Sequence, residues 1–557
     1  MRMSLIPAVI AAIAMLTTTA ARAVLIISKK PTQNVTCDRG SCSATAADAV
    51  LNVKDLNKLL RISDLSLTAS SPANDIVFDA AFSWTNTHKL TLNADRSITI
   101  KQPVAVQGTG ALDLEYGHVT AGSFVVAKKG KIDFWDLNSV LTINSERFIL
   151  IADVATMAAY VSGSQYVSLA FAKDYDAQVD GIYPGAPATA YFGGTLDGLG
   201  HVISNLTIHD TAPSKYDGLI SNSYGATFRN IRLANVDIAG ANNSSVGGFA
   251  GDGEARFQNV STTGTVAGGE YANVGGLIGS LDGYPYSAID SSSSAAVIAG
   301  GASSYAGGLV GTTYDYGGLI SNSHATGKVT GGDAGGLVGS NYGGDILHSY
   351  ATGAVTSIGS TGGGLVGQNG GNIERSFAIG TVSAEGNADA GGLVGYIGGG
   401  KIYQNYATGN VSATDASSIG GFAGENANGD IQNAYANGSV TGGANAYVGG
   451  LLGQQDLLLS YSYAIGAVSA GPGSTVGGLV GIDYGRRDIS RTYWDMDTSG
   501  ISDPAEGAGS PANDHGIAGL TTTEFQSDLP KGFVKSIWGQ DPQVNNGFPY
   551  LRALKPR

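Results

Sequence analysis

The chain has 557 residues, of which 14% are charged and 84 are glycine. This composition excludes a disordered polyelectrolyte and a helix-rich enzyme, and it implies many turns. The net charge of −14 makes the chain a poor partner for nucleic acid and for an anionic membrane surface, so neither is expected.

The N-terminal residues have the pattern of a cleaved signal peptide. Arg2 precedes an apolar stretch from Leu5 to Leu16, and Ala21-Arg22-Ala23 matches an A-x-A cleavage site. The apolar stretch is too short to span a bilayer, and no later segment approaches about 20 continuous apolar residues. We therefore predict that residues 1–23 are removed and that the mature chain, without a transmembrane segment, is secreted or displayed at the cell surface.

The two cysteines, Cys37 and Cys42, flank a short segment that contains a glycine. In an oxidising compartment this spacing predicts a local disulfide. A zinc site would need two further ligands, which no second cysteine pair or nearby histidine supplies. We expect no metal and no other cofactor, and we assign residues 24–74 to an N-terminal cap in which 55–60 form a short helix.

The region that follows predicts strands. Residues 75–150 alternate apolar and polar residues between turn formers, which favours short coils of stacked strands. Residues 153–162 (DVATMAAYVS) predict one short helix within a transition segment, 151–215.

A pentapeptide of the form Gly-Gly-Leu-Val-Gly dominates residues 216–481. Nine copies recur at intervals of 28 to 32 residues, and a degenerate tenth spans Asp217–Ser221. The copies begin at Gly247, Gly275, Gly307, Gly335, Gly363, Gly391, Gly420, Gly449 and Gly477. We expect each leucine or phenylalanine to point inward, with the flanking glycines permitting positive φ at both corners and close approach of neighbouring backbones.

A second element, such as YATGAV from Tyr350, follows the later pentapeptides. Each repeat therefore contains two short β-prone runs and a third that leads into the next glycine-rich turn, with no helical period. Three short strands per 28 residues is the content of one coil of a parallel β-helix, and right-handed coiling is the rule for parallel crossovers. The predicted fold is therefore an all-β, right-handed parallel β-helix with small capping elements at both ends.

The second element carries one aromatic residue per repeat. These residues form a column, each followed by alanine: Tyr350, Phe377, Tyr406, Tyr435 and Tyr463. Strict alternation from the core residue four positions earlier would bury polar residues such as His348 and Arg375, so we expect a bend that points the alanines inward and the aromatics outward. The outward column either braces the stack or lies under a loop, or it is a binding stripe for glycan or protein surfaces.

The repeat ends near residue 481, and we assign residues 482–557 to a C-terminal cap. This segment contains Trp494 and Trp538, and a capping box from Thr521 to Glu524 opens a short helix that ends by Pro530.

These motifs resemble a known group of bacterial proteins. GGLVG has the form of the GLUG motif, and GTLDGLGHVISNLTI (194–208) is similar to the segment before GLUG arrays in filamentous-haemagglutinin-like exoproteins. The strand-rich region 90–117 resembles haemagglutinin-type repeats. The resemblance implies a β-helical adhesin that binds a glycan or a host or matrix protein, and export by an outer-membrane transporter of the two-partner type. The chain contains no NPNG stretch, so the route across an outer membrane stays open.

The sequence also bears on an enzymatic function. GLUG motifs also occur beside metalloprotease domains, but the chain has no HExxH, no G-x-S-x-G elbow and no P-loop. Asp197, His201 and Asp210 are the nearest approach to the carboxylate cluster of a polysaccharide lyase or glycoside hydrolase, and Asp197 is explained equally well as a turn former. We predict a non-enzymatic adhesin-like protein without catalytic residues. A polysaccharide-acting enzyme on the same scaffold and a structural matrix exoprotein are the alternatives.

Overall fold

The structure, a computed structural model, describes residues 23–283, 287–314, 318–414, 417–485 and 489–556. The predicted signal peptide therefore lies, apart from its last residue, outside the described residues. By its contacts the chain divides into two compact units, one formed by residues 1–130 with 140–145 and the other by 131–139 with 146–557. Stacked parallel coils of short strands make up both units, so the predicted all-β parallel β-helix is confirmed.

The first unit begins its coils earlier than expected, because β1 already pairs in parallel with β4 and β6 within the predicted N-terminal cap. Alternate residues are buried, as Leu90 and Leu92 are in β8, which is the pattern of a strand with one face on a core. One sheet has the order β12 (Phe124–Val126), β9 (Ile98–Ile100), β6 (Asp75–Phe78), β1 (Val24–Ser28) and β4 (Asp48–Asn52). A second row contains β3 (Ser41–Ala44), β5 (Leu65–Ala69), β8 (Lys89–Ala94), β11 (Ala111–Tyr116) and β14 (Val140–Ile143), and β7 (Phe82–Trp84) pairs with β10 (Val104–Val106).

Two local predictions for this unit are confirmed. Cys37 and Cys42 form a disulfide between β2 (Val35–Asp38) and β3, which pair as an antiparallel hairpin. The predicted short helix is α1 (Val53–Leu60), which begins after the side chain of Asn52 caps its first turn.

The second unit begins with a helix on the outside of its first coils. As expected, α2 (Val154–Gly163) follows Asp153, whose side chain accepts a hydrogen bond from Thr156 N, and it buries Val154, Met157 and Val161. The surrounding elements are β13 (Ile132–Phe134), β15 (Glu146–Ile151), β16 (Ser168–Phe171), β17 (Tyr175–Asp176), the 3-10 turn η1 (Ala177–Asp180), β18 (Ile182–Tyr183), β19 (Thr195–Asp197), β20 (Val202–Ser204) and β21 (Thr207–His209).

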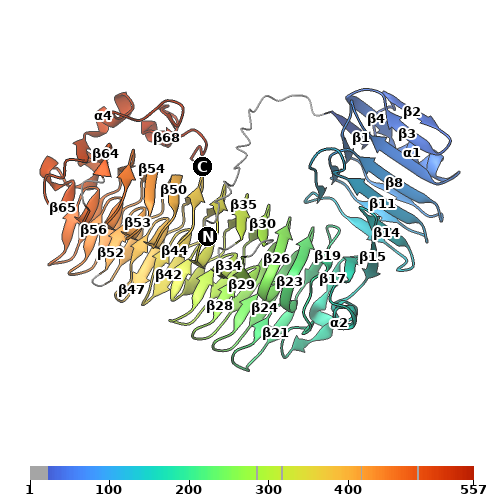
Figure 1. Ribbon diagram of the computed structural model, residues 1–557, viewed down its shortest axis with the longest axis horizontal. Coiled ribbons are helices and arrows are strands. Elements are labelled where there is room, and N and C mark those ends of the chain that lie inside the picture. The colour runs from blue at the N-terminus through green and yellow to red at the C-terminus, as the bar shows by residue number, and fades with distance from the viewer. Residues whose placement is uncertain (1–22, 284–286, 315–317, 415–416, 486–488, 557) are drawn as a thin grey trace, which may run out of the picture. The chain divides into compact units, whose positions relative to one another are not determined.

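From residue 216 onward each coil adds one short strand to each of several parallel rows, which can be followed from β23 to β65 in Figure 1. The ten-stranded sheet consists of β22 (Tyr216–Asp217), β25 (Ser245–Gly247), β28 (Asn273–Gly275), β33 (Tyr305–Gly307), β38 (Asp333–Gly335), β43 (Gly362–Gly363), β48 (Ala390–Gly391), β52 (Ser418–Gly420), β56 (Tyr447–Gly449) and β61 (Thr475–Gly477). The row after the pentapeptide turn consists of β23 (Ile220–Arg229), β26 (Ala250–Gln258), β29 (Ile278–Asp282), β34 (Val310–Tyr314), β39 (Val338–Asn341), β44 (Val366–Asn369), β49 (Val394–Ile397), β53 (Ala423–Asn426), β57 (Leu452–Gln455), β62 (Val480–Asp483) and β65 (Ala508–Ser510).

The remaining rows complete each coil. The third contains β30 (Ala288–Asp290), β35 (Leu319–Ser321), β40 (Ile346–Leu347), β45 (Ile373–Glu374), β58 (Leu459–Ser460) and β63 (Ile489–Ser490), and the fourth β31 (Ser293–Ser294), β36 (His324–Ala325), β41 (Tyr350–Ala351), β46 (Phe377–Ala378), β59 (Tyr463–Ala464), β64 (Thr492–Asp495) and β66 (Ile517–Leu520). Two strands, β50 (Lys401–Ala407) and β54 (Asp430–Ala436), span both of these rows. The fifth contains β24 (Arg232–Ala239), β27 (Ser261–Ala267), β32 (Val297–Ala299), β37 (Val329–Gly331), β42 (Val355–Ile358), β47 (Val382–Glu385), β51 (Val411–Ala413), β55 (Val440–Gly442) and β60 (Val468–Ala470).

A typical coil therefore has five short strands, from β38 through β42, rather than the three runs expected. One extra division falls at the expected bend before the aromatic residue. His348, Arg375, Gln404 and Asn433 occupy this position with φ between 48° and 56°, the left-handed region. This conformation bends the strand, so that the alanine three residues later points into the core. Gln404 and Asn433 are themselves buried, and Asn433 accepts a hydrogen bond from Trp538 Nε1.

The pentapeptide glycines are required by close packing. A Cβ atom would lie 1.8 Å from Val338 O at Gly335, 2.1 Å from Gly364 O at Gly336 and 2.6 Å from Ala306 N at Gly339. The expectation of positive φ at these corners is wrong, because none of the described pentapeptide glycines lies in that region. The backbone of the ten-stranded sheet instead presses directly on the next row, and only glycine leaves room for this contact.

Polar residues inside the stack are paired from coil to coil. The backbone N–H of Ser323 donates to Ser349 Oγ over 3.2 Å, and that of Ser349 donates to Ser376 Oγ over 3.1 Å. In the row after the pentapeptide, Asn341 Nδ2 donates to Asn369 Oδ1 over 2.8 Å. These ladders satisfy buried groups and link neighbouring coils.

Coil stacking continues beyond the last pentapeptide, although residues 482–557 were predicted to form only a cap. β65 pairs with β62, and β66 with β64, so stacking extends to Leu520. The chain then forms α4 (Thr522–Ser527), with the predicted capping box between Thr521 and Glu524. The other elements of this region are α3 (Met496–Ser499), the 3-10 turns η2 (Pro504–Glu506) and η3 (Asn545–Gly547), and the antiparallel pair β67 (Trp538–Gly539) and β68 (Tyr550–Leu551).

Candidate functional site

The predicted aromatic column is a continuous ring stack on the fourth row of strands. It begins one coil earlier than expected, at His324, whose ring centroid lies 4.7 Å from that of Tyr350. The following centroid distances, from Tyr350 through Phe377, Tyr406 and Tyr435 to Tyr463, are 4.9, 4.8, 5.0 and 5.2 Å, with planes 3° to 12° apart. We call this column from His324 to Tyr463 the aromatic stripe.

The stripe points outward, but most of it is covered. Tyr350 is partly buried, whereas the exposed fraction is 6% for Phe377, 1% for Tyr406 and 0% for Tyr435 and Tyr463. The hypothesis of an accessible binding stripe is therefore wrong for these four residues. The reading in which the column lies under a loop describes them correctly.

At Tyr435 and Tyr463 the covering element is the C-terminal segment, residues 521–554. It packs aromatic side chains on the stripe, with the Trp538 ring 6.2 Å from Tyr435 and 5.8 Å from Tyr463. Trp538 Nε1 donates to Asn433 Oδ1 over 3.0 Å, and Asn545 Nδ2 donates to the Tyr463 hydroxyl over 2.9 Å. Burial raises the pKa of the Tyr435 and Tyr463 phenols well above the usual value. Because the rings are apolar on both faces, covering them removes a large apolar area from water.

A second set of residues, which includes several exposed tyrosines, lies on other strand rows of the same coils. It comprises three parallel columns, which we name together the tyrosine–carboxylate strip. The first, on the ten-stranded sheet, contains Tyr216, Ser245, Asn273, Tyr305, Asp333, Thr361, Asp389, Ser418, Tyr447 and Thr475. The second, on the next row, contains Asn222, Asp252, Ser280, Thr312, Ser340, Gln368, Tyr396, Glu425, Gln454 and Ile482. The third lies two residues further along and contains Tyr224, Glu254, Asp282, Tyr314, Tyr342, Gly370, Gly398, Ala427, Asp456 and Tyr484.

Side-chain contacts hold the columns side by side. Gln368 Nε2 donates to Asp333 Oδ2 over 3.0 Å, which joins the first two columns. The hydroxyls of Tyr305 and Tyr342, from the first and third columns, lie 3.2 Å apart. The Tyr484 hydroxyl donates to that of Tyr447 over 3.4 Å and makes the same connection nearer the C-terminus. In both tyrosine pairs the residues are 37 apart in sequence, so the same geometry occurs twice along the strip.

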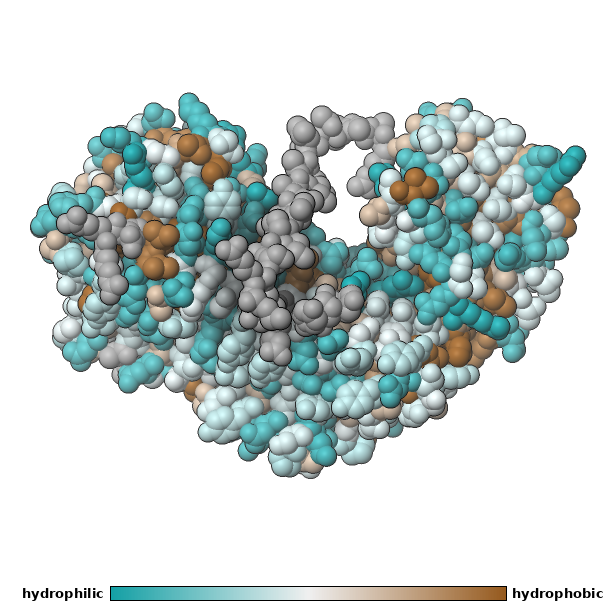
Figure 2. Space-filling view, viewed as in Figure 1, coloured by the Kyte–Doolittle hydropathy of each residue, from teal (hydrophilic) through white to brown (hydrophobic). Residues whose placement is uncertain are grey.

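Several tyrosine rings of the strip are accessible. The exposed fraction is 37% for Tyr314, 51% for Tyr342 and 53% for Tyr484. The rings of Tyr314 and Tyr342 are stacked, with centroids 5.8 Å apart and planes 9° apart. On the face seen in Figure 2, hydrophilic and intermediate residues cover most of the coils and hydrophobic residues are scattered among them.

The carboxyl groups of the strip lie close to one another. Burial, followed by the charges of Asp389 and Asp456, raises the pKa of Glu425 to about 7. Burial and the neighbouring Asp282 raise the pKa of Asp252 to about 6. The three columns contain no lysine and no arginine, so the strip is acidic. The raised pKa values hold Glu425 and Asp252 partly protonated near neutral pH.

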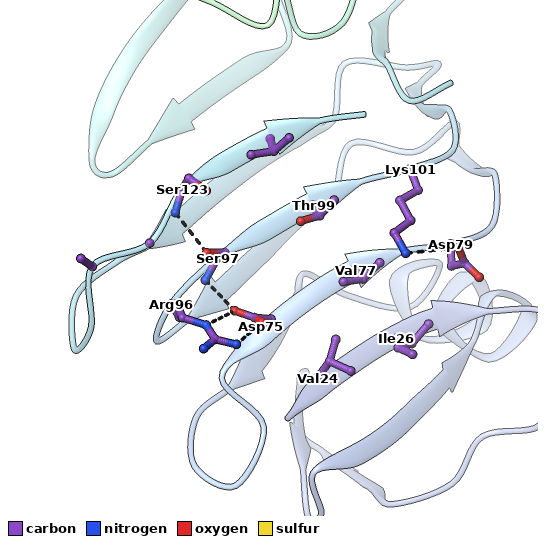
Figure 3. Close-up of a pocket in the computed structure, with 13 residues that line it drawn as sticks. Val24, Ile26, Asp75, Val77, Asp79, Arg96, Ser97, Thr99, Lys101 and Ser123 are labelled. Carbon is purple, nitrogen blue, oxygen red and sulfur yellow. Dashed lines mark hydrogen bonds and ion pairs between the residues drawn. The ribbon is translucent and has the colours of Figure 1, made fainter. Parts of the chain in front are cut away.

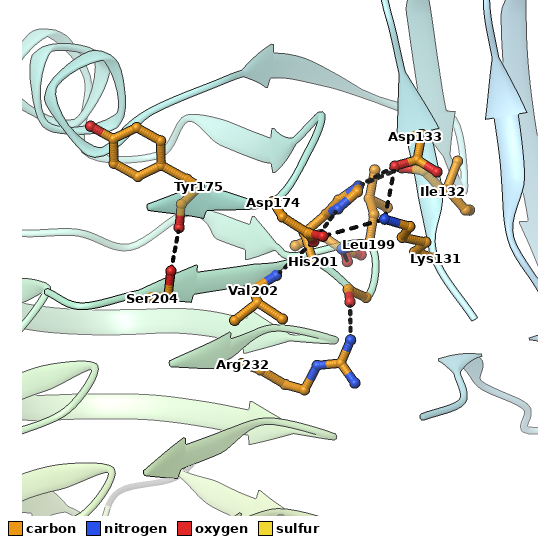
Figure 4. A network of polar contacts seen from close by, with 12 residues as sticks. Lys131, Ile132, Asp133, Asp174, Tyr175, Leu199, His201, Val202, Ser204 and Arg232 are labelled. Carbon is orange, nitrogen blue, oxygen red and sulfur yellow. Dashed lines mark hydrogen bonds and ion pairs between the residues drawn. The ribbon is translucent and has the colours of Figure 1, made fainter. Parts of the chain in front are cut away.

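The three residues considered for catalysis do not form one site. His201 is 1% exposed, with Nδ1 2.9 Å from Asp174 Oδ1 and Nε2 2.8 Å from Ile132 O, as Figure 4 shows. Asp197 is buried against Arg229, at 2.6 Å, and Asp210 accepts from Ala212 N. Each of the three side chains therefore has its own local partner.

The first unit has a separate hollow of about 910 Å³ on the outer face of β1, β6, β9 and β12 (Figure 3). Val24, Ile26 and Val77 lie on its floor, and the Arg96–Asp75 ion pair lies at its side. Its lining also includes Ser97, Thr99, Ser123 and the Lys101–Asp79 pair. Among the described residues of the whole chain, no group of three or more histidine, cysteine, aspartate or glutamate side chains is arranged to hold a metal ion.

Comparison with known proteins identifies the repeat. The sequence model of the GLUG motif matches residues 302–330, 331–356 and 415–441. The chain therefore contains GLUG-motif repeats. Its GLUG region contains Tyr305, Tyr314 and Tyr342 of the strip as well as part of the aromatic stripe. No helix within the described part of the chain is long and apolar enough to cross a membrane.

Two further proteins are similar to this GLUG-repeat chain. Halomucin from Haloquadratum walsbyi is 29% identical over 263 residues, which are 43% of this chain and 3% of Halomucin's length. The crystal structure of a candidate immunoglobulin A1 protease from Bacteroides ovatus aligns with 73% of this chain and 93% of its own, at 18% identity and a TM-score of 0.28. The second likeness is too weak to carry an argument about fold or activity.

The strip was missed in the sequence because its members flank the GLUG pentapeptide on both sides. Tyr305 lies two residues before its glycine pair, and Tyr342 lies three residues after the last glycine of the next copy. The two meet only when consecutive coils stack. The signal that was available is the recurrence of tyrosine and carboxylate at these two flanking positions.

Proposed function

We propose that this GLUG-repeat protein is an exported, non-enzymatic, adhesin-like β-helix that binds glycan or protein surfaces through its outer face. The observation that carries this proposal is the tyrosine–carboxylate strip. Its columns gain one residue from every coil of the array. Tyr314, Tyr342 and Tyr484 of the strip are exposed, whereas Tyr406, Tyr435 and Tyr463 of the aromatic stripe are buried. A stack that repeats the same outward positions can add many weak contacts into firm attachment.

A specific observation favours a second function, a polysaccharide-acting enzyme. Glu425, with its raised pKa, lies near Asp389 and Asp456 among the tyrosines of the strip. A protonated carboxylic acid beside a carboxylate is the pairing that glycoside hydrolysis requires. We rank this function below binding because each of these residues occupies a position that other coils fill with serine, threonine or alanine, as at Ser340 and Thr361.

Export and its partners are part of the proposal. We propose that the mature chain begins at Val24, that it reaches the cell exterior, and that an outer-membrane transporter of the two-partner type carries it. Mass spectrometry of the chain recovered from culture medium and from the cell surface tests the first two points. A chain that keeps residues 1–23 and stays inside the cell would contradict them.

Binding and catalysis are separated by one experiment on the full mature chain. Soluble polysaccharides and immobilised matrix proteins are incubated with the protein, and both retention and the release of new reducing or unsaturated ends are measured. The proposal predicts retention on at least one of these surfaces with no new ends, and the Glu425→Gln variant should be retained equally. New ends that disappear in Glu425→Gln would replace the proposal with the enzymatic function.

A further inference from the structure

We propose that Tyr305, Tyr314 and Tyr342 form the main subsite of a binding surface for a neutral polysaccharide, which runs along the tyrosine–carboxylate strip. This inference rests on the proposed function, and it names the ligand class and the residues that the proposed function leaves open.

Tyr314 and Tyr342 are partly exposed tyrosines in neighbouring coils of the strip. Tyr342 is 51% exposed and stacks on Tyr314, which is 37% exposed, so the two rings form one small platform at the surface. A tyrosine ring has an apolar face and a polar edge, and the C–H faces of pyranose rings pack on such surfaces. The hydroxyl of Tyr305 contacts that of Tyr342 over 3.2 Å and fixes the orientation of the platform.

Carboxyl groups of the strip can form hydrogen bonds to a ligand that lies on the tyrosines. Further along the strip lie the carboxyl groups of Asp389, Glu425 and Asp456, close enough to raise the pKa of Glu425. Carboxylates accept hydrogen bonds from sugar hydroxyls, and a protonated carboxyl also donates one. The Tyr447–Tyr484 pair then repeats the first tyrosine pair, with Tyr484 53% exposed. A ligand that follows the strip meets aromatic, carboxyl and aromatic groups in turn.

Charge decides which class of polysaccharide fits. The three columns contain carboxyl groups and no lysine or arginine, and the whole chain has a net charge of −14. Polysaccharides with uronate or sulfate groups would be repelled from this surface. Partial protonation of Glu425 and Asp252 weakens the attraction for a cationic chain. An uncharged polysaccharide, held by ring packing and hydroxyl contacts, is the best match.

The periodicity of the strip favours a linear polymer. Neighbouring coils are separated by the 4.7 to 5.2 Å measured between successive rings of the aromatic stripe. Every coil adds one residue to each column of the strip at this spacing. A chain of identical sugar units lying along the stack therefore meets equivalent backbone positions at regular intervals, which a globular protein partner would not do.

The test uses the full mature chain and three soluble probes, namely a neutral β-glucan, alginate as an anionic chain and chitosan oligomers as a cationic one. Titration calorimetry compares the wild type with the double variant Tyr314→Ala/Tyr342→Ala. The matched control is Tyr166→Ala, because Tyr166 is 68% exposed and lies outside the three columns. Circular dichroism and the thermal midpoint confirm that all variants fold.

We expect the wild type to bind the neutral β-glucan and not alginate. The double variant should bind the β-glucan about tenfold or more weakly, since two aromatic contacts are lost, and the Tyr166→Ala control should equal the wild type. Tyr342→Phe should lose less than the double variant, because its ring remains.

Equal β-glucan affinity in the wild type and in a folded double variant would overturn the inference while leaving the proposed function intact. The inference would also be overturned if the wild type bound only chitosan and lost this binding when salt was added. If the wild type binds no polysaccharide and no matrix protein, both the inference and the proposed function are wrong.

Discussion

The aromatic stripe and the tyrosine–carboxylate strip are two aromatic surfaces built by the same coils with different outcomes. In the stripe, rings repeat in every coil without carboxyl groups between them. Phe377 to Tyr463 are buried, and the C-terminal segment packs on Tyr435 and Tyr463. In the strip, tyrosines are separated by carboxyl and hydroxyl side chains, and Tyr314, Tyr342 and Tyr484 remain exposed. A continuous apolar column is stabilised by being covered, whereas an interrupted one can remain in water and stay available for a ligand.

The largest effect is expected from Trp538→Ala, which removes part of the cover over the aromatic stripe. Trp538 is fully buried between the stripe and the C-terminal segment and hydrogen bonds to Asn433. Its removal should cost about 3–5 kcal/mol, as for other buried large-to-small changes, and should release the segment while the coils stay folded. Limited proteolysis should then cleave within 521–557 first. Loss of the whole β signal together with the segment would show that the coils depend on it, which contradicts this account.

A second effect is expected from Asp217, which lies in β22 next to Tyr216 of the strip. The Asp217 carboxyl is fully buried without a hydrogen-bond partner among the described residues, and burial together with Asp210 raises its pKa from 3.8 to about 7. The folded state therefore holds a proton that the unfolded chain releases, so stability should fall as pH rises from about 4 to 7 and then level off.

Asp217→Asn removes this dependence, because its side chain carries no charge at any pH. At pH 8 the variant should exceed the wild type by on the order of 3 kcal/mol, and at pH 4 the difference should be small. Asp217→Val matches the Val246 partner in the next strand and should stabilise the chain at both pH values. Chemical denaturation at several pH values gives these differences. Identical wild-type and Asp217→Asn profiles would contradict the prediction.

A smaller effect is expected from Gly339→Ala, at a close contact between the ten-stranded sheet and the next row. A Cβ at Gly339 would lie 2.6 Å from Ala306 N, so Gly339→Ala must separate the ten-stranded sheet from the next row. We expect a loss of about 1–3 kcal/mol, typical of overpacking, with increased solvent exposure of Tyr305. Gly163→Ala is the control, because a Cβ there would meet nothing within 4 Å. Equal stability of the two variants in thermal unfolding would show that the close contact is not required.

The smallest effect is expected from removing either of two tyrosine hydroxyls in the covered part of the stripe. The Tyr463 hydroxyl hydrogen bonds to Pro549 O and Asn545, whereas that of Tyr435 is buried without a partner among the described residues. Tyr463→Phe should cost about 1 kcal/mol, and Tyr435→Phe should be neutral or slightly stabilising. Urea denaturation of both variants measures the difference, and the reverse order would contradict the described contacts.

Much of the fold follows from the sequence because the repeat is local. The period of the pentapeptides predicts stacked coils, and the cost of burying His348 and Arg375 predicts the bend that directs Ala351 and its equivalents inward. The prediction for the pentapeptide glycines is correct in the close approach of backbones and wrong in the positive φ. The sequence cannot distinguish the two requirements, because both are met by glycine.

The candidate site could not be predicted to the same extent, because it depends on contacts between distant residues. Nothing in the sequence pairs Trp538 with Tyr435, which lie 103 positions apart. The sequence therefore cannot predict which segment packs on the stripe. The strip is equally non-local, since Tyr305 and Tyr342 belong to different coils.

The most direct test of the central claim is hydroxyl-radical footprinting of the full chain with and without the neutral β-glucan. Without ligand, Tyr342 and Tyr484 should be oxidised readily, and Tyr435 and Tyr463 should be protected. Added β-glucan should protect Tyr314, Tyr342 and Tyr484 while leaving Tyr166 unchanged. Oxidation of Tyr435 and Tyr463 in the free chain, with protection of these residues by ligand, would show that the stripe is the open surface and would contradict the account.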